Sequence, residues 1–271
     1  MRKILDYRYT LVLLTVLMVF TVSFSATAIN GREVMERVED RKSGETQHAL
    51  LGMDLIDQEG NVRARVVEIW SQENKNNLRE SVMVFHEPAS IEGTRFLQIE
   101  NKNSDDDQWI YLPDLGRVRR IAGGQGSDSF MGTDFTYDDL KSRDINDFKY
   151  ELLREEKFNG YQTYVVEAVP KNPAAEQYAK TISWVTKKHY IPIKLEMYDK
   201  ESQKLYKVMT VNSEIQKIDG IWTAFSATME NLETGHSTRL YIQQRGGNYL
   251  LEYNKNIDDS RFTQQFLRTG R

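Results

Sequence analysis

The feature that most constrains the fold is an alternation of apolar and polar residues with a period of two, which starts at His48 and recurs up to residue 243. In residues 51–55 every second side chain is large and apolar, and the alternation returns in residues 62–70 after the turn-forming residues 58–61. A period of two is typical of a β-strand with one buried face, and two such runs around a short turn predict a hairpin.

Further runs with this period follow along the chain. They predict strands over residues 81–87, 94–100, 108–112, 148–157, 161–169, 180–186, 191–198, 205–215, 221–230 and 237–243, so that about twelve strands are expected in all. Turn-forming pairs such as Asn159-Gly160 and Asp219-Gly220 connect them, and no connection holds a helix of crossover length. Consecutive antiparallel hairpins on this scale predict a barrel or a strongly curved sheet.

Short helices are expected at three places. Asn30 is a favourable N-cap for a helix over residues 31–41. Thr136 and the acidic residue three positions later have the spacing of a capping box, which predicts a helix over residues 137–143. Residues 260–267 predict a C-terminal helix whose apolar side chains dock as a plug that closes the barrel.

The first 28 residues have the pattern of a secretory signal peptide. Basic residues at positions 2, 3 and 8 precede an apolar run of about 14 residues, and Ala26-Thr27-Ala28 supplies an A-x-A cleavage site. An uncleaved membrane anchor is the alternative, although such an anchor normally needs about 20 apolar residues. We expect cleavage after Ala28 and export, which leaves residues 29–271 as a single domain.

Composition and residue spacing exclude several classes of function. The chain has no cysteine, which excludes disulfides, thiolate metal sites, cysteine nucleophiles and a lipid-modified N-terminal cysteine. Its formal net charge of -4, with both signs interspersed, gives no argument for nucleic-acid binding. The four histidines lack the spacing of a zinc motif, and Gly124–Ser127 lacks that of a phosphate-binding loop. We therefore expect no cofactor, no metal site and no catalytic residues, so the protein is not expected to be an enzyme.

A glycine-rich loop interrupts the strands in the middle of the chain. Gly123, Gly124 and Gly126 are followed within a few residues by the large apolar side chains of Phe130 and Met131. Leaving such a side chain in water forfeits roughly 1.5–3 kcal/mol, so we expect both to be covered. A mobile loop that ends in large apolar residues beside a barrel mouth predicts a lid.

The same part of the sequence carries a resemblance to a known family. Its most distinctive stretch is Phe130-Met131-Gly132-Thr133-Asp134-Phe135, and further matching positions are Met53 to Asp57 with Gly60, Pro88, Gly93-Thr94 and Ile191-Pro192. Over nearly all of residues 29–271 the chain resembles the outer-membrane lipoprotein-sorting protein family, which is related to the periplasmic carriers LolA and LolB. The compact carriers themselves are shorter and lack the Phe-Met-Gly stretch, so no lid-locking arginine is assigned here.

The resemblance implies a fold and a role. The fold is an incomplete, unclosed antiparallel β-barrel of about eleven strands with a few short helices plugging a hydrophobic cavity for acyl chains. The role is that of a periplasmic carrier, in a family whose members often act beside transporters of the resistance-nodulation-division kind. The expected partners are acyl chains of lipids or lipoproteins, with an inner-membrane transporter and an outer-membrane acceptor as further candidates.

Large apolar side chains on several predicted strands are the candidates for cavity and lid. The candidate ligand-binding residues are Trp70, Phe85, Phe96, Trp109, Tyr111, Phe130, Met131, Phe135, Leu195, Met197 and Phe225. The alternative is that these side chains fill a core. A barrel of this width leaves internal volume for a ligand only where helices do not plug it.

The densest basic cluster consists of Arg117, Arg119 and Arg120. Arginine side chains suit phosphates, so the cluster is a candidate for contact with lipid head groups or an anionic membrane. The alternative is a solvated strand face whose charges pair with nearby aspartates, namely Asp128, Asp134, Asp138 and Asp139.

Two functions of different class follow from the sequence. The first is a monomeric periplasmic carrier or chaperone that hides lipid or lipoprotein acyl chains and performs no catalysis. The second is a periplasmic adaptor or accessory protein of a membrane transporter, which binds protein rather than lipid through a sheet edge or the lid.

Overall fold

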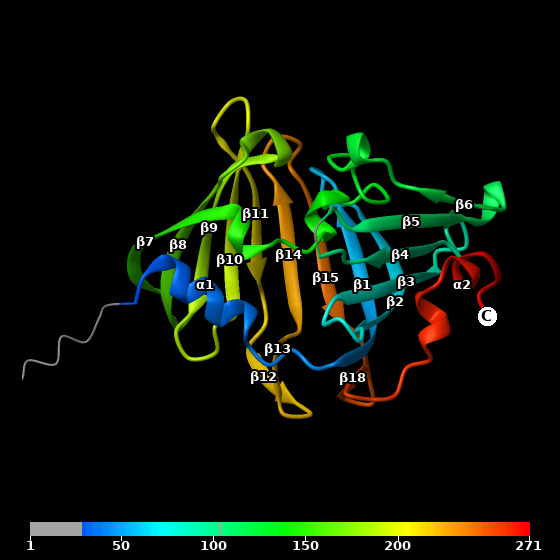
Figure 1. Ribbon diagram of the computed structural model, residues 1–271. Helices are drawn as coiled ribbons and strands as arrows, with labels where there is room; N and C mark the ends of the chain where they lie inside the picture. The colour runs from blue at the N-terminus through cyan, green and yellow to red at the C-terminus, as the bar shows by residue number, and fades with distance from the viewer. Residues whose placement is uncertain (1–28, 103) are drawn as a thin grey trace, which may run out of the picture.

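The computed structural model describes residues 29–102 and 104–271, and the expected signal peptide, residues 1–28, lies outside them. The described chain is mainly antiparallel β-structure, with one sheet of fourteen strands that curves around an interior (Figure 1). The two terminal strands of the sheet, β6 and β7, are not paired with each other, so the barrel is unclosed. The fold class expected from the sequence is confirmed.

The order of strands in the large sheet follows from consecutive antiparallel pairs. It runs β6 (Arg117–Arg120), β5 (Asp107–Leu112), β4 (Arg95–Ile99), β3 (Arg79–Glu87), β2 (Val62–Glu73), β1 (Thr46–Ile56), β15 (His236–Ile242), β14 (Ser226–Asn231), β11 (Leu205–Val211), β10 (Pro192–Asp199), β9 (Tyr178–Thr186), β8 (Tyr161–Pro170) and β7 (Phe148–Phe158). β18 (Leu251–Tyr253) also pairs with β1. Two separate hairpins are formed by β12 (Ile215–Ile218) with β13 (Ile221–Ala224), and by β16 (Gln244–Arg245) with β17 (Asn248–Tyr249).

Two of the predicted strands are wrong in extent. The strands predicted over 205–215 and 221–230 each divide in two, so that β12 and β13 leave the large sheet as a hairpin. The Ser213 hydroxyl accepts hydrogen bonds from the backbone N–H groups of Phe225 and Ser226, at 2.8 and 3.2 Å. The Ser213 hydroxyl thus takes the place of a strand partner where the strands divide. The alternation of apolar and polar residues continues through this point in the sequence, although the strands on its two sides belong to different sheets.

Register places one row of side chains on the concave face across the middle of the sheet. Met209 lies opposite both Leu195 and Met229, and Met229 lies opposite Thr238. Side chains directly opposite on one face of an antiparallel sheet contact each other. The interior therefore has a continuous apolar floor from β10 to β14.

The N-terminal helix α1 (Gly31–Glu39) covers part of this interior. Asn30 caps it in a complete capping box with Glu33, and the helix ends two residues before the predicted end. Val34 is fully buried in a cluster with residues of β8 and β9. A Cβ on Gly31 would lie 2.7 Å from the carbonyl carbon of Glu151, so only glycine allows the helix to begin this close to β7.

The other helical segments are short. They are η1 (Pro113–Leu115), η2 (Gly123–Gln125), η3 (Asp138–Leu140), η4 (Ile145–Asp147), η5 (Pro173–Ala175), η6 (Asp259–Phe262) and α2 (Gln264–Thr269). The helix predicted over 137–143 is wrong: only a single 3₁₀ turn forms, because Lys141 is already extended and the Ser142 N–H donates to Asp106. The chain from 141 to 147 instead crosses toward β7, and we call it the strap.

The C-terminal helix docks through the residues expected, but on the other face of the sheet. Phe266 and Leu267 are buried against Val82 and Leu97, which alternate with the concave-face residues of the same strands. Figure 1 shows α2 beside β4 and β6, at the outer end of the sheet. The segment therefore covers the convex face and does not plug the interior, which corrects the expectation.

Candidate functional site

One half of the interior is filled by the loop segment 121–140. Phe130 is 2% exposed, and its ring centroid lies 5.0 Å from that of Phe96 and 5.5 Å from that of Tyr137. These side chains pack with others of the concave face of β1 to β5, including Phe85. The predicted lid thus forms a second layer over this half of the sheet.

Polar contacts hold the loop segment to the sheet. The Arg65 guanidinium donates to the backbone oxygen of Met131 at 2.7 Å. The Thr238 hydroxyl accepts from the Asp134 N–H at 2.9 Å and donates to the Asp134 carboxylate at 2.7 Å. The segment is therefore fixed to β2 and to β15, at points far apart in the sequence.

The other half of the interior contains a cavity of about 430 Å³. It lies between the concave faces of β7 to β11 and β14, helix α1 and the strap. The residues that line it are Met35, Val38, Glu39, Phe135, Asp139, Lys141, Arg143, Ile145, Phe148, Tyr150, Ala168, Thr181, Ser183, Pro192, Leu195, Met197, Met209 and Met229. Its volume is within the range of small-molecule sites, about 300–1,000 Å³.

Methionine is the most frequent residue in this lining. Met35, Met197, Met209 and Met229 come from α1, β10, β11 and β14. Unbranched thioether side chains change rotamer at low cost and adapt to ligands of irregular shape. Such a wall accommodates a flexible apolar ligand better than a rigid one.

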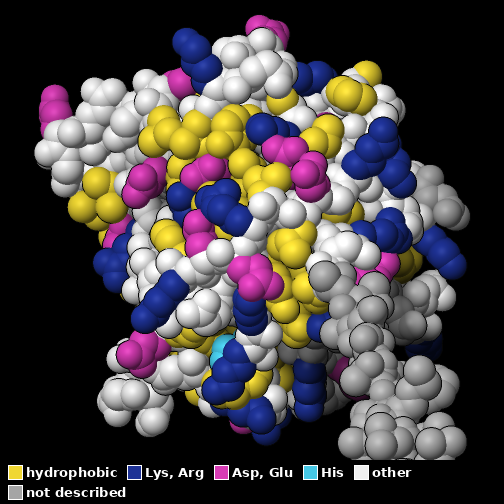
Figure 2. All heavy atoms as spheres, turned by 90° about the vertical axis from the view of Figure 1, so that its left-hand side faces the viewer, with side chains coloured by type: hydrophobic (Ala, Val, Ile, Leu, Met, Phe, Trp, Pro, Cys, Tyr) yellow, Lys and Arg dark blue, Asp and Glu magenta, His cyan; other side chains and the backbone are white. Residues whose placement is uncertain are grey.

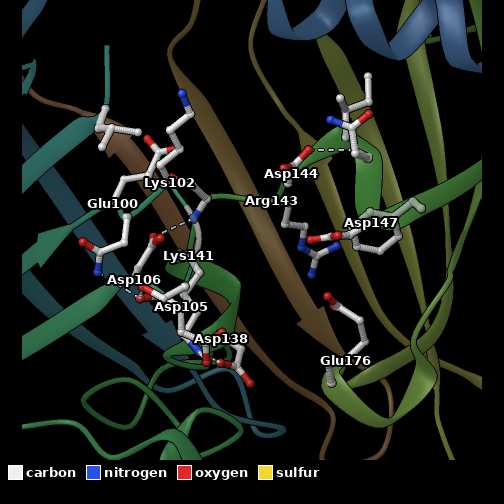
Figure 3. Close-up of a pocket in the computed structure, with 18 of the residues that line it drawn as sticks. Glu100, Lys102, Asp105, Asp106, Asp138, Lys141, Arg143, Asp144, Asp147 and Glu176 are labelled. Carbon is white, nitrogen blue, oxygen red and sulfur yellow. Dashed lines mark hydrogen bonds and ion pairs between the residues drawn. The ribbon is translucent and has the colours of Figure 1, made fainter. Parts of the chain in front are cut away.

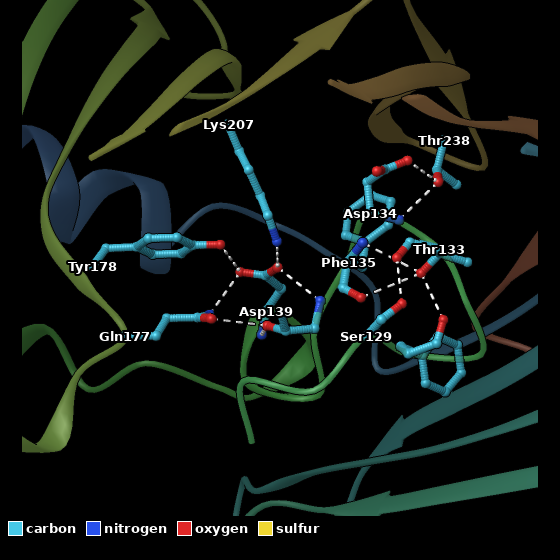
Figure 4. Close-up of polar contacts among 11 residues, drawn as sticks. Ser129, Thr133, Asp134, Phe135, Asp139, Gln177, Tyr178, Lys207 and Thr238 are labelled. Atoms are coloured by element: carbon cyan, nitrogen blue, oxygen red, sulfur yellow. Dashed lines mark hydrogen bonds and ion pairs between the residues drawn. The ribbon is translucent and has the colours of Figure 1, made fainter. Parts of the chain in front are cut away.

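A buried polar cluster closes one end of the cavity, centred on Asp139 (Figure 4). One oxygen of its carboxylate accepts from the Tyr178 hydroxyl and the Gln177 amide, both at 2.9 Å. The other oxygen accepts from the Thr136 N–H at 2.9 Å and lies 3.6 Å from the Lys207 ammonium. The Asp139 N–H in turn donates to the Thr136 hydroxyl, as the predicted capping box requires.

Burial of this cluster determines its protonation chemistry. The Asp139 and Lys207 side chains are 5% and 3% exposed. Burial, reinforced by the negative charge of Asp139, raises the pKa of Tyr178 far above its usual value. The hydroxyl therefore remains protonated and donates to Asp139 at every physiological pH. The cluster ties η3 to strands β9 and β11.

Sequence reasoning missed Lys207, although it left a signal. Lys207 shares the period-two phase of Met209, whose side chain faces the cavity. A lysine in phase with the buried face of a strand needs a buried partner. The partner was not visible from the sequence because η3 lies far from β11 along the chain.

A larger and strongly acidic recess of about 920 Å³ adjoins the cavity (Figure 3). Glu39, Lys141, Arg143, Ile145 and Phe148 line both spaces. The acidic lining residues are Glu39, Asp40, Glu100, Asp105, Asp106, Asp138, Asp144, Asp147 and Glu176, against the basic residues Lys102, Lys141 and Arg143. We call this recess the acidic mouth.

The acidic mouth perturbs its own carboxyl groups. Burial raises the pKa of Glu176, and the negative charges of Asp138 and Asp147 raise it further against the opposing effect of Arg143. Burial likewise raises the pKa of Asp106, and that of Glu39. Ionisation of these groups at neutral pH therefore costs stability in the folded protein.

A Glu176→Gln variant should be more stable than the parent at pH 7, by less than about 1 kcal/mol, or about 2 °C in Tm. Because folding raises the pKa of Glu176 above its ordinary value of 4.5, the parent loses stability as the pH rises from about 4.5 through the higher folded-state pKa. Glutamine does not titrate and avoids this loss. Thermal unfolding at pH 7 and pH 5 measures the difference, which should shrink at pH 5. Glu201→Gln, in an exposed turn, is the matched control. An equal gain at both pH values would contradict the assignment.

The structure separates the candidate ligand-binding residues into different environments. Phe135, Leu195 and Met197 line the cavity. Phe85, Phe96, Phe130 and Met131 belong to the packed layer under the loop segment, Trp70, Trp109 and Tyr111 lie under the C-terminal segment, and Phe225 packs against Tyr249 in a further cluster. Contact of any of them with a ligand remains a prediction.

The basic cluster lies on the edge strand β6. Arg117, Arg119 and Arg120 are exposed, and Arg120 forms an ion pair with Asp107 on the neighbouring strand. The aspartates expected as partners are engaged elsewhere: Asp138 with Lys141, Asp139 with Lys207 and Asp134 with Thr238. The expected pairing with Asp134, Asp138 and Asp139 is therefore wrong.

Two further observations concern the described part of the chain. Within it, no three His, Asp or Glu side chains are arranged so that they could hold a metal ion. None of the helices in residues 29–102 and 104–271 has the length and hydropathy of a membrane span.

Comparison with known proteins identifies the family. A family model described as "-like: Uncharacterized protein" matches residues 77–269. None of the curated proteins matches the chain significantly. An outer membrane lipoprotein-sorting protein domain from Vibrio parahaemolyticus is 31% identical, with a TM-score of 0.79 and coverage of 88% of this chain and 98% of that one.

Two further solved structures share the fold. A DUF1329 family protein from Desulfovibrio piger is 28% identical, with a TM-score of 0.80 and coverage of 88% and 97% of the two chains. A LolA superfamily protein from Nitrosomonas europaea is 20% identical, with a TM-score of 0.66 and coverage of 88% and 100%, and shares the fold. The chain belongs to the family of outer-membrane lipoprotein-sorting proteins.

Proposed function

We propose that the protein is a periplasmic carrier that binds acyl chains of lipids or lipoproteins in the cavity between α1, the strap and the concave sheet. The observation that carries this proposal is the methionine-rich lining of the 430 Å³ cavity. Each methylene that leaves water for such a wall contributes about 0.8 kcal/mol, so a long chain binds without directional chemistry. The lipoprotein-sorting relative supports the same role.

The polar groups around the cavity suit a carrier without catalysis. The Asp139 carboxylate accepts three hydrogen bonds and faces Lys207, so its lone pairs are occupied by the fold. A general base needs a free lone pair within reach of the substrate. We propose that these groups position the loop segment at the end of the cavity.

We further propose that the protein acts as a monomer and exchanges cargo with an inner-membrane transporter and an outer-membrane acceptor. The exposed Arg117 and Arg119 remain candidates for contact with anionic head groups during exchange, since neither forms an ion pair in the described part of the chain.

Met209→Asp should lower the affinity of the delipidated protein for a fluorescent fatty-acyl probe by at least about tenfold, equivalent to about 1.4 kcal/mol. The reason is that Met209 lines the cavity and a carboxylate there meets the acyl chain. Probe titration measures the affinity, and far-ultraviolet circular dichroism verifies the β-structure.

The matched control is Val208→Asp, the next residue of β11, which is half-buried like Met209 but lies in the opposite phase of the strand. It should retain probe affinity. Equal losses in both variants would indicate a general loss of folding. Failure of the delipidated parent to bind any acyl probe would reject the carrier function.

A further inference from the structure

The hairpin β12–β13 carries an exposed tryptophan surrounded by basic side chains. Trp222 is 36% exposed, and Lys217 lies directly opposite it across the hairpin. The His189 ring centroid lies 4.0 Å from that of Trp222, and the Lys188 and Lys217 ammonium groups lie 5.8 and 5.6 Å from the same ring. We call Lys42, Lys188, His189, Lys217 and Trp222 the hairpin patch.

Lys42 reaches the same hairpin from the linker after α1. A Cβ placed on Gly220, at the hairpin turn, would lie 3.9 Å from the Lys42 ammonium. Figure 2 shows lysine and arginine side chains gathered in the lower part of this face of the molecule. The turn therefore has basic groups on more than one side.

The charges of the hairpin patch are not neutralised locally. In residues 29–102 and 104–271, no carboxylate oxygen lies within 4.0 Å of the ammonium groups of Lys42, Lys188 or Lys217, and all three are exposed. Asp219, the acidic residue at the turn, instead accepts from the Tyr253 N–H. The patch is thus a local basic surface on a chain whose formal net charge is -4.

We propose that the hairpin patch docks the protein on an anionic lipid surface. An indole ring has an apolar body and a polar N–H, which suits the boundary between acyl chains and head groups. Lysines around it suit anionic phospholipids and retain contact with the apolar surface through their methylene stems. Because the rest of the chain is acidic, charge complementarity favours approach through this patch. The inference does not depend on the cargo.

The test uses flotation of the mature protein with vesicles of phosphatidylcholine, alone or in equal mixture with phosphatidylglycerol. The parent should bind the mixed vesicles and lose this binding as salt is added. Each lysine close to an anionic surface contributes about fivefold in affinity, so K188Q/K217Q should bind roughly 25-fold more weakly. Trp222→Ala should also weaken binding while leaving its salt dependence unchanged.

The matched control is K75Q/K204Q, which removes two exposed lysines elsewhere and should bind as the parent does. Melting temperature and acyl-probe affinity should be unchanged in K188Q/K217Q, which separates docking from cargo binding. The proposal is overturned if the parent binds both vesicle types equally or neither. It is also overturned if the control loses as much affinity as K188Q/K217Q, or if only R117Q/R119Q loses binding, which would place docking at β6.

Discussion

A Phe130→Ala variant is expected to lose about 3–5 kcal/mol of the free energy of unfolding. The ring is 2% exposed and makes edge-to-face contacts with the rings of Phe96 and Tyr137. It also lies between the loop segment and the concave face of β1 to β5. Truncation leaves a cavity between two layers that the sheet cannot close by itself, because its strands are fixed by their register.

Denaturant unfolding at equilibrium measures this loss. Leu115→Ala is the control, since Leu115 is 55% exposed at the turn before β6 and its truncation should change stability by no more than about 0.5 kcal/mol. A stable Phe130→Ala variant with reduced acyl-probe affinity would contradict the packing role. It would support instead the lid expected from the sequence, in which this side chain moves to contact cargo.

The strands were predictable because their period is local. Residues 193–197 alternate apolar and polar side chains, and β10 (Pro192–Asp199) presents Leu195 and Met197 to the interior. One buried face fixes the phase of every residue in such a strand. The curved antiparallel sheet follows from many such strands joined by short turns.

The positions of the aromatic side chains in the loop segment were not predictable in the same way. Phe130 and Phe135 are both apolar and only five residues apart, yet one is packed under the loop segment and the other lines the cavity. The chain reverses between them at Met131 and Gly132, whose φ angles are +53° and +74°. A left-handed turn has no period, so neither direction can be deduced from spacing.

The faces covered by distant segments were also not predictable. The apolar residues of α2 predict docking, and Phe266 does dock, but on the convex face beside Leu97. Both faces of β3 and β4 carry apolar side chains. In β3, for example, Val82 is buried on one face of the sheet and Phe85 on the other. A sheet that is apolar on both faces offers two surfaces, and the path of the intervening chain decides between them.

Asp139→Ala is expected to cost about 3–5 kcal/mol of the free energy of unfolding, because it leaves the Lys207 ammonium buried without its counter-ion. The Asp139 carboxylate is the only charged partner within 4.0 Å of Lys207 in the described part of the chain, and both side chains are almost fully buried. Removal also frees the Tyr178 hydroxyl and the Gln177 amide from their common acceptor. Each freed buried donor adds to the cost.

The complementary changes should be milder. Lys207→Met leaves Asp139 with the hydrogen bonds from Tyr178, Gln177 and Thr136, so we expect a loss of about 1–3 kcal/mol. Asp139→Asn combined with Lys207→Met replaces the ion pair by a neutral pair of similar volume, which in buried sites is often close to neutral in stability. Denaturant unfolding of the parent, Asp139→Asn, Lys207→Met and the variant that combines these two substitutions completes a double-mutant cycle and gives the coupling energy directly. A coupling energy near zero, or an Asp139→Ala variant within about 1 kcal/mol of the parent, would show that η3 is held to β9 and β11 by packing alone.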